Sequence, residues 1–196
     1  MSQISPKTYG ILGGTFDPPH IGHLILAQSA FESFRLDRVI FIPASIQPHK
    51  IKKTHTPGAL RRKMLELAIG DDSRFAVSDI ELNREGVSYT VDTLNLLRAE
   101  YPDDNFYLLL GSDNVSDIAA WKNPEQIFAL CQVAAAHRPD FTPSGPYADC
   151  VIYFEMPGIQ LSSSVIRNRV REGKSIKYLV PRPVEDYIIA NGLYRA

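Results

Sequence analysis

Residues 13–24 read GGTFDPPHIGHL and lie between a short apolar run at 8–12 and an amphipathic stretch at 21–34. The apolar run is typical of a strand, and the stretch after it has apolar side chains at helical spacing. Two glycines, two prolines and two histidines therefore stand where a strand passes into a helix. Glycine lets the backbone turn sharply near a ligand, and a helix N-terminus presents unpaired N–H groups to an anion. The stretch predicts a phosphate-binding turn.

The two histidines of this turn, His20 and His23, are three residues apart, so their imidazoles share one side of a first helical turn. Each imidazole can donate to a phosphate oxygen, and a neighbouring anion favours its protonated form. Surface histidines and a metal pair are the alternatives. A helical metal pair usually has a spacing of four and a third ligand elsewhere, which the sequence does not offer. The phosphate site is favoured, with Gly22 leaving room for the phosphate.

Strand-like and helix-like patterns alternate along the rest of the chain, without a repeat, a low-complexity tract or a clear linker. We predict further strands over 38–42, 75–77, 106–110, 132–136 and 151–154. We predict further helices over 57–69, 90–100, from 124 onward, 162–172 and 184–190. This alternation predicts an α/β fold of one domain, residues 1–196, with a Rossmann-like, doubly wound parallel sheet and helices on both faces. Ligands of such sheets bind beyond the carboxyl ends of the strands.

The composition excludes several classes of protein. With 44% hydrophobic and 22% charged residues the chain is globular, and a net charge of -1 gives no bulk field for nucleic acid or anionic membrane. Its apolar segments are shorter than the roughly 20 residues of a membrane-spanning helix, and its N-terminus lacks the core of a signal peptide. We expect a cytoplasmic protein with neither a nucleic acid polymer nor a membrane as partner. The sequence leaves a homo-oligomer open.

Two further segments offer groups for phosphate. Lys50 ends the motif Pro48-His49-Lys50, which closely follows the second predicted strand on the ligand side of the sheet. Ser162 and Ser164 stand over a helix N-terminus, with Arg167 one turn on. Hydroxyls, N–H groups and a guanidinium together suit a second phosphate cradle, and the alternative is a capped helix with a surface arginine.

Three other segments suit the remainder of a nucleotide substrate. Asp113 follows the strand at 106–110, where it either caps the next helix or binds ribose hydroxyls. Trp121, the only tryptophan, is either a core residue or a surface on which a planar ring stacks. Tyr89 and Thr90 begin a hydroxyl-rich helix, whose N–H groups suit a carboxylate if the segment is more than a capped helix start.

At residues 14–23, GTFDPPHIGH resembles the GxFDPxHxGH signature of the HxGH nucleotidyltransferase superfamily, whose members join ATP to a phosphate-bearing or similar acceptor and release pyrophosphate. Other segments are similar, in the same order, to bacterial nicotinate-nucleotide adenylyltransferases: FIPASIQPHK (41–50), DIELNREGVSYTVDTL (79–94), LLLGSDN (108–114), AAWKNPEQIF (119–128) and LSSSVIRNRVREG (161–173). The resemblance covers almost the whole chain. It departs at Ser164, where the family usually has threonine, and at Pro19, where it has isoleucine or valine.

This resemblance implies transfer of the adenylyl group of ATP to nicotinate mononucleotide, giving nicotinate adenine dinucleotide and pyrophosphate in NAD biosynthesis. It implies His20 and His23 as catalytic residues, and as further groups that bind ATP or its phosphates Gly13, Gly14, Thr15, Phe16, Lys50, Ser162, Ser164 and Arg167. Trp121 would stack on the nicotinate ring, Tyr89 and Thr90 would bind its carboxylate, and Asp113 would bind nucleotide. Mg²⁺ would arrive with ATP and keep most of its waters, without a dedicated protein site.

Three rival functions remain at this point. Adenylyltransferases for nicotinamide mononucleotide or for phosphopantetheine are the nearest, and the segment at 88–94 with Trp121 favours the nicotinate acceptor. A nucleotide-binding regulator without catalysis is the alternative from another class. The presence of both histidines with Lys50 and Arg167 favours an enzyme.

Overall fold

The computed structural model describes residues 5–46, 55–84, 86–137 and 144–195. Within these ranges a single six-stranded sheet, all of its strands parallel, has the order β3-β2-β1-β4-β5-β6. The strands are β1 (Thr8–Gly14), β2 (Arg38–Pro43), β3 (Phe75–Val77), β4 (Asn105–Gly111), β5 (Gln132–Ala136) and β6 (Ile152–Phe154). This order confirms the predicted doubly wound sheet. The direction in which successive strands are added to the sheet reverses between β1 and β4, which are themselves parallel.

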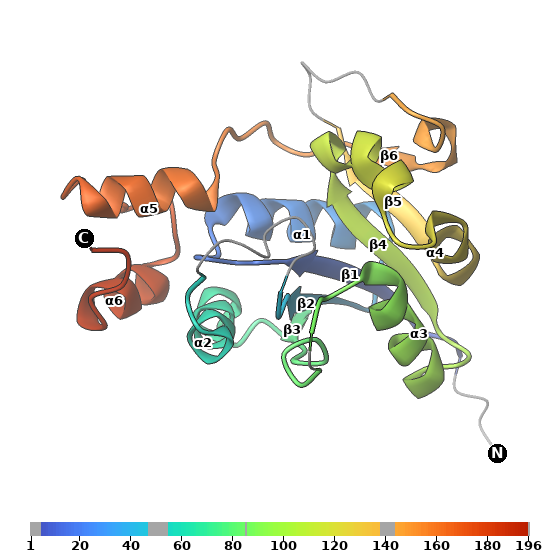
Figure 1. The fold of residues 1–196 in the computed structure, drawn as a ribbon, viewed down its shortest axis with the longest axis horizontal. Helices are drawn as coiled ribbons and strands as arrows, with labels where there is room; N and C mark the ends of the chain where they lie inside the picture. The colour runs from blue at the N-terminus through green and yellow to red at the C-terminus, as the bar shows by residue number, and fades with distance from the viewer. Residues whose placement is uncertain (1–4, 47–54, 85, 138–143, 196) are drawn as a thin grey trace.

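Helices cover both faces of the sheet (Figure 1). They are α1 (Ile21–Ser33), α2 (Gly58–Ile69), α3 (Thr90–Glu100), α4 (Pro124–Leu130), α5 (Ser163–Arg171) and α6 (Arg182–Ala190), with 3-10 helices η2 (Ser112–Ala120) and η3 (Ala148–Cys150). Figure 1 shows α1 on one face and α3 with α4 on the other, while α5 and α6 lie at one end of the molecule near α2. In the described part of the chain no helix is both long enough and apolar enough to cross a bilayer.

The sheet has two cores because its central strands bury side chains on both faces. Along β2, Val39 and Phe41 pack with α1 and with Leu65 of α2, whereas Ile40 and Ile42 point into the cluster formed by α3, η2 and α4. Alternate residues of a strand face opposite sides, so a continuous apolar run such as RVIFI fits only a strand that is covered twice. Burial on both faces therefore places β2 inside the sheet rather than at its edge, between β3 and β1.

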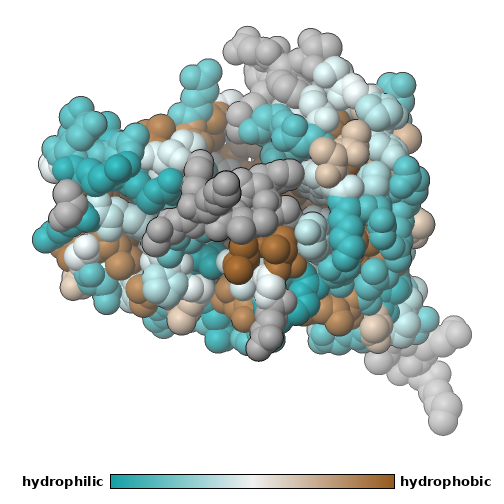
Figure 2. Space-filling model, in the orientation of Figure 1, coloured by the Kyte–Doolittle hydropathy of each residue, from teal (hydrophilic) through white to brown (hydrophobic). Residues whose placement is uncertain are grey.

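A third apolar cluster joins α2, α5 and α6, and its buried members are Met64, Ile166, Ile176, Val180, Val184 and Ile188. The arginine-rich outer side of α5 stays toward solvent, and the surface over α5 is mostly hydrophilic in Figure 2. Ile21 N–H donates to the Leu179 carbonyl at 3.1 Å, which ties the start of α1 to the chain before α6. This cluster brings the late segment 162–167 beside the turn that opens α1.

Several predicted boundaries were wrong by one or two residues, and the 3-10 helices η2 and η3 were missed. Strand β1 continues through both glycines, whereas we predicted that it ends at residue 12. Helix α2 begins at Gly58, with Pro57 as a cap residue that makes no side-chain hydrogen bond. The 3-10 helix η2 follows β4 directly. A 3-10 helix has i to i+3 hydrogen bonds and three residues per turn, so its sequence does not show the 3.6-residue apolar period by which we predicted helices.

Candidate active site

A cavity of about 660 Å³ lies beyond the carboxyl ends of β1 and β4, where the strand order reverses. All of the predicted site residues that the structure describes line this cavity: Gly13, Gly14, Thr15, Phe16, His20, His23, Tyr89, Thr90, Asp113, Trp121, Ser162, Ser164 and Arg167. Lys50 lies outside the described residues. Side chains separated by about 150 positions in sequence therefore surround one space, as expected where parallel strands end together.

The turn after β1 differs from the one we predicted. Gly13 and Gly14 pair with Ile42 and Pro43 as the last residues of a strand, so they do not form the turn. The backbone instead reverses at Phe16, whose φ of 50° is left-handed, next to a cis peptide bond between Asp17 and Pro18. The Phe16 ring is buried in the core under Gly14, where an added Cβ would lie 3.0 Å from it. Phe16 therefore has only its backbone to offer a ligand.

The two histidines form a stacked pair at the start of α1. Their ring centroids are 3.6 Å apart with an interplanar angle of 23°. The backbone N–H of His20 donates to His23 Nδ1 at 3.1 Å. A Cβ at Gly22 would lie 3.1 Å from His20 Nδ1, so Gly22 makes room for the His20 ring. Gly22 also lines the cavity, and its role in leaving room for a phosphate stays a prediction.

Both imidazoles are neutral at pH 7 in the ligand-free protein. Burial lowers the pKa of His20 to about 4. Burial, and then the neighbouring His20, lower the pKa of His23 well below its usual value. Because His23 Nδ1 accepts a hydrogen bond, neutral His23 carries its proton on Nε2, which makes that nitrogen a donor. The pair can donate to an anion before either ring gains a proton.

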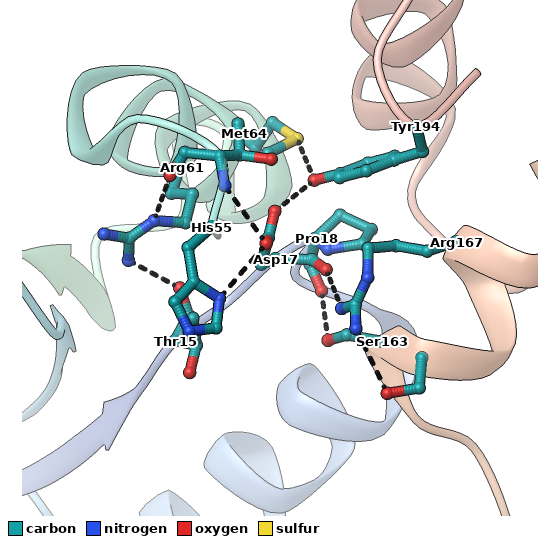
Figure 3. Close-up of polar contacts among 11 residues, drawn as sticks. Thr15, Asp17, Pro18, His55, Arg61, Met64, Ser163, Arg167 and Tyr194 are labelled. Atoms are coloured by element: carbon teal, nitrogen blue, oxygen red, sulfur yellow. Dashed lines mark hydrogen bonds and ion pairs between the residues drawn. The ribbon is translucent and has the colours of Figure 1, made fainter. Parts of the chain in front are cut away.

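A buried arginine holds the turn from the side of α2. Arg61 is 2% exposed, and its Nη1 donates to the Thr15 carbonyl at 2.7 Å, while its Nε donates to the Thr56 carbonyl at 2.8 Å (Figure 3). A signal was available in the sequence. Arg61 stands three and four residues before Met64 and Leu65, on the buried side of its helix.

Helix α5 holds the turn from the opposite side. Ser163 Oγ donates to the Pro18 carbonyl at 2.8 Å, and Arg167 Nη1 donates to the Asp17 carbonyl at 2.7 Å (Figure 3). Arg167 Nη2 also donates to Ser164 Oγ at 3.2 Å, and Ser162 Oγ caps the helix by accepting from Val165 N–H at 3.3 Å. The residues that cap the N-terminus of α5 are thus also those of the candidate phosphate cradle. Ser163, whose hydroxyl stands over the same helix N-terminus but which we did not assign to phosphate, makes the contact across the cavity edge.

The far end of the cavity carries the residues predicted for the second substrate. Tyr89 precedes the first residue of α3, Thr90, in extended conformation. Lys122 Nζ lies 4.8 Å from the Tyr89 ring centroid and 3.0 Å from Asp92 Oδ1. Trp121 is half-buried, packing on the core and lining the cavity at once, so it is a core residue and its stacking on a ligand ring stays a prediction.

Asp113 and Glu81 are among the acidic side chains that line the cavity. Asp113 lies in the first turn of η2, and a Cβ at Gly111 would come within 2.5 Å of its Oδ1. Gly111 is therefore needed for this position of the carboxylate. Glu81, which we missed, is 8% exposed and accepts from Thr93 Oγ1 at 2.7 Å.

Comparison with known proteins identifies the class. The family model described as cytidylyltransferase-like matches residues 11–169, so the chain belongs to that family of nucleotidyltransferases. Among its curated relatives is a "probable nicotinate-nucleotide adenylyltransferase" of Geobacillus thermodenitrificans, 44% identical over 95% of this chain and 86% of the relative. The relative of the same name from Bacillus cytotoxicus is 43% identical over 97% of this chain and 100% of its own length. Within the wider family, the chain belongs to the nicotinate-nucleotide adenylyltransferases.

Solved structures support the fold. The nicotinic acid mononucleotide adenylyltransferase of Plasmodium falciparum, solved in complex with APC, superposes with a TM-score of 0.80. The same enzyme in complex with NaAD gives the same score. Sequence identity is 22%, and the alignment covers 96% of this chain and 97% of the Plasmodium chain. The predicted Rossmann-like architecture and the predicted family are confirmed.

Proposed function

We propose that this enzyme transfers the adenylyl group of ATP to nicotinate mononucleotide, with nicotinate adenine dinucleotide and pyrophosphate as products, in NAD biosynthesis. Membership of the family supports this reaction. The observation that carries it is the stacked pair of His20 and His23, which opens α1 on the wall of a cavity shared with Arg167 and Trp121. A cytoplasmic location and a possible oligomer stay predictions from sequence.

The reaction requires little covalent chemistry from the protein. A phosphate oxygen of nicotinate mononucleotide attacks the α-phosphorus of ATP, the new P–O bond forms, and the bond to pyrophosphate breaks. The attacking phosphate is already an anion at neutral pH, so neither a protein nucleophile nor a strong base is needed. Catalysis consists of positioning the substrates in line and stabilising the negative charge on phosphate and pyrophosphate.

The histidine pair and α5 are suited to this charge. His20 and His23 donate to the phosphates of ATP, whose approach raises the pKa of both imidazoles above the low values of the ligand-free protein. Arg167 takes the β- and γ-phosphates together with the hydroxyls of Ser162 and Ser164 and the N–H groups that open α5. Backbone groups at 13–16 line the approach to the α-phosphate, and we assign a phosphate contact to Lys50 as well.

The substrate is the magnesium complex of ATP. Mg²⁺ neutralises phosphate charge and usually keeps several of its waters when phosphates hold it. We therefore assign it no dedicated ligand in this chain. The protein's own donors act on the phosphate oxygens that the ion leaves free.

The acceptor lies at the far end of the cavity. Trp121 offers a ring face to the nicotinate, and the N–H groups at the start of α3, next to Tyr89 and Thr90, receive its carboxylate. Asp113 suits ribose hydroxyls. A carboxylate received by N–H donors favours the acid over the amide, since an amide brings its own N–H groups against them.

An acceptor comparison tests the proposed function. Purified protein is incubated with ATP and Mg²⁺ and with nicotinate mononucleotide, nicotinamide mononucleotide or phosphopantetheine in turn, and pyrophosphate release is measured. We expect the nicotinate acceptor to give the highest kcat/KM. A higher value with another acceptor would reassign the substrate, and ATP binding without pyrophosphate release from any of them would indicate a regulator.

Replacement of Trp121 with alanine tests the acceptor end. We expect the KM for nicotinate mononucleotide to rise by roughly tenfold, the upper range of an aromatic ring contact, with little change in the KM for ATP. Trp121→Phe keeps a ring and should give an intermediate value. Steady-state kinetics with each substrate varied in turn measures both constants, and an equal rise in both KM values would contradict stacking on the nicotinate ring.

A further inference from the structure

The carboxylate of Asp17 is a meeting point of three distant segments (Figure 3). It is 3% exposed, on the wall of the cavity. Its Oδ1 accepts from the Tyr194 hydroxyl at 2.7 Å, across 177 residues of sequence. Its Oδ2 accepts from Thr56 N–H at 3.3 Å and lies 3.6 Å from His55 Nδ1. Both carboxylate oxygens are therefore held by groups from outside the turn.

The backbone around Asp17 carries the contacts that order the phosphate site. Its own carbonyl receives Arg167 Nη1, and the next carbonyl, of Pro18, receives Ser163 Oγ. His20 follows two residues later. A rotation of Asp17 would therefore displace the guanidinium and the start of α1 together.

Tyr194 reaches this position because the chain turns back after α6. Gly192 and Tyr194 both have left-handed backbone, with φ of 59° and 63°. Leu193 packs on the third apolar cluster, and its N–H donates to the Ile188 carbonyl at 3.0 Å. The phenol then passes Met64, whose Sδ is 3.8 Å from the Tyr194 oxygen, and ends at Asp17. The contact is built by a defined turn and by packing of Tyr194 on the third apolar cluster.

The contact with Tyr194 makes the burial of the Asp17 carboxylate less costly. A negative charge buried without hydrogen-bond donors or an opposite charge would destabilise the turn. Burial alone raises the pKa of Asp17, but hydrogen bonds from Thr56 and Tyr194 and the charge of Arg167 outweigh it, so that its pKa lies below the ordinary value. Arg61 and His55 also face the carboxylate from the side of α2. The Asp17 carboxylate is thus ionised, and its orientation is fixed by partners at both oxygens.

We propose that Tyr194 is a positioning residue of the ATP site: its hydroxyl orients the Asp17 carboxylate and, through it, Arg167 and the turn that carries His20. The C-terminal segment is then a working part of the nucleotide site. This inference rests on the proposed function. It is tested against the same substrates.

The test is Tyr194→Phe, which removes one oxygen and keeps the ring. We expect the KM for ATP to rise roughly fivefold, the value of one net hydrogen bond, while the KM for nicotinate mononucleotide stays unchanged. Loss of folded protein lowers kcat alone and leaves KM values unaltered, so a purely structural role would not give this split. Tyr187→Phe is the matched control, since Tyr187 of α6 packs on the same cluster and, among the described residues, makes no hydrogen bond through its hydroxyl.

A second readout needs no activity. Carbon-13 NMR of the Asp17 carboxyl should show a higher pKa in Tyr194→Phe than in the wild type, because a donor that lowers this pKa has been removed. Should Tyr194→Phe fold poorly, Asp17→Asn serves instead, with the same ATP-selective rise in KM expected. Where Tyr194→Phe does fold, adding it to Asp17→Asn should raise the KM for ATP by less than it does alone.

Three outcomes would overturn the proposal: unchanged kinetics in Tyr194→Phe, an equal rise in both KM values, or a fall in kcat alone that follows the loss of folded protein. These are distinct from failure of the proposed function. In that case the wild-type protein itself would release no pyrophosphate from ATP with nicotinate mononucleotide.

Discussion

Replacement of His20 with alanine should lower kcat by about 10²–10³-fold, the range observed when one donor to developing oxyanion charge is removed from an active site. The expectation follows from placement. His20 is 6% exposed, stacks on His23 and lines the cavity at the start of α1, where helix N–H groups also face an anion. No other imidazole of the described cavity wall occupies that position, since His23 is held by the His20 N–H and His55 faces Asp17.

The variant is expected to remain folded, because the ring can be removed without breaking the turn. The Nδ1 atom of His20 is buried against Gly22 and, within the described part of the chain, has no hydrogen-bond partner to lose. We expect the free energy of unfolding to fall by about 1–2 kcal/mol, the ordinary cost of a buried truncation. Circular dichroism and thermal unfolding measure this separately from turnover.

His137→Ala is the matched control for that experiment. His137 is a half-buried histidine directly after β5 that does not line the cavity, and its main-chain N–H, which alanine retains, donates to the Phe154 carbonyl at 2.8 Å. Its replacement should leave kcat unchanged. A folded His20→Ala enzyme with wild-type turnover would remove the histidine pair from the mechanism.

The sequence predicted the meeting of His20, Arg167 and Trp121 because parallel strands end at one edge of the sheet. Each of these residues follows a strand, and a doubly wound order brings their loops to the same side. The alternation of strands and helices is enough for that conclusion. A sequence can therefore predict which residues of a site lie together even where it does not predict the contacts between them.

The contacts themselves were less predictable, for three physical reasons. The burial of Arg61 was not predicted because guanidinium groups are seldom buried, and only carbonyl partners from other segments make its burial favourable. Tyr194 has no local pattern that links it to Asp17. The left-handed backbone at Phe16 runs against the preference for glycine at such positions, so the two adjacent glycines predicted the turn in the wrong place.

Replacement of Arg167 with alanine is the second large effect, with kcat/KM for ATP expected to fall by about a hundredfold. Two losses combine. The variant has no guanidinium for the phosphates, and it leaves the Asp17 carbonyl without the donor that now lies 2.7 Å away, each worth about 1.5–3 kcal/mol before overlap between them is considered. The KM for nicotinate mononucleotide should change little, because Trp121 and the start of α3 bind that substrate at the other end of the cavity.

Two arginine-to-lysine variants sharpen this prediction. Arg167→Lys keeps the charge but cannot donate to Asp17 and Ser164 at once as the planar fork does, so it should recover only a part of the loss. Arg169→Lys, on the same helix, is the control: Arg169 Nε donates to the Ser175 carbonyl at 2.8 Å, away from the cavity lining. If Arg167→Lys matched the wild type, charge alone would suffice. If Arg167→Ala also had the kcat/KM of the wild type for ATP, Arg167 would have no part in binding ATP, and the phosphates would have to lie wholly against the turn at His20.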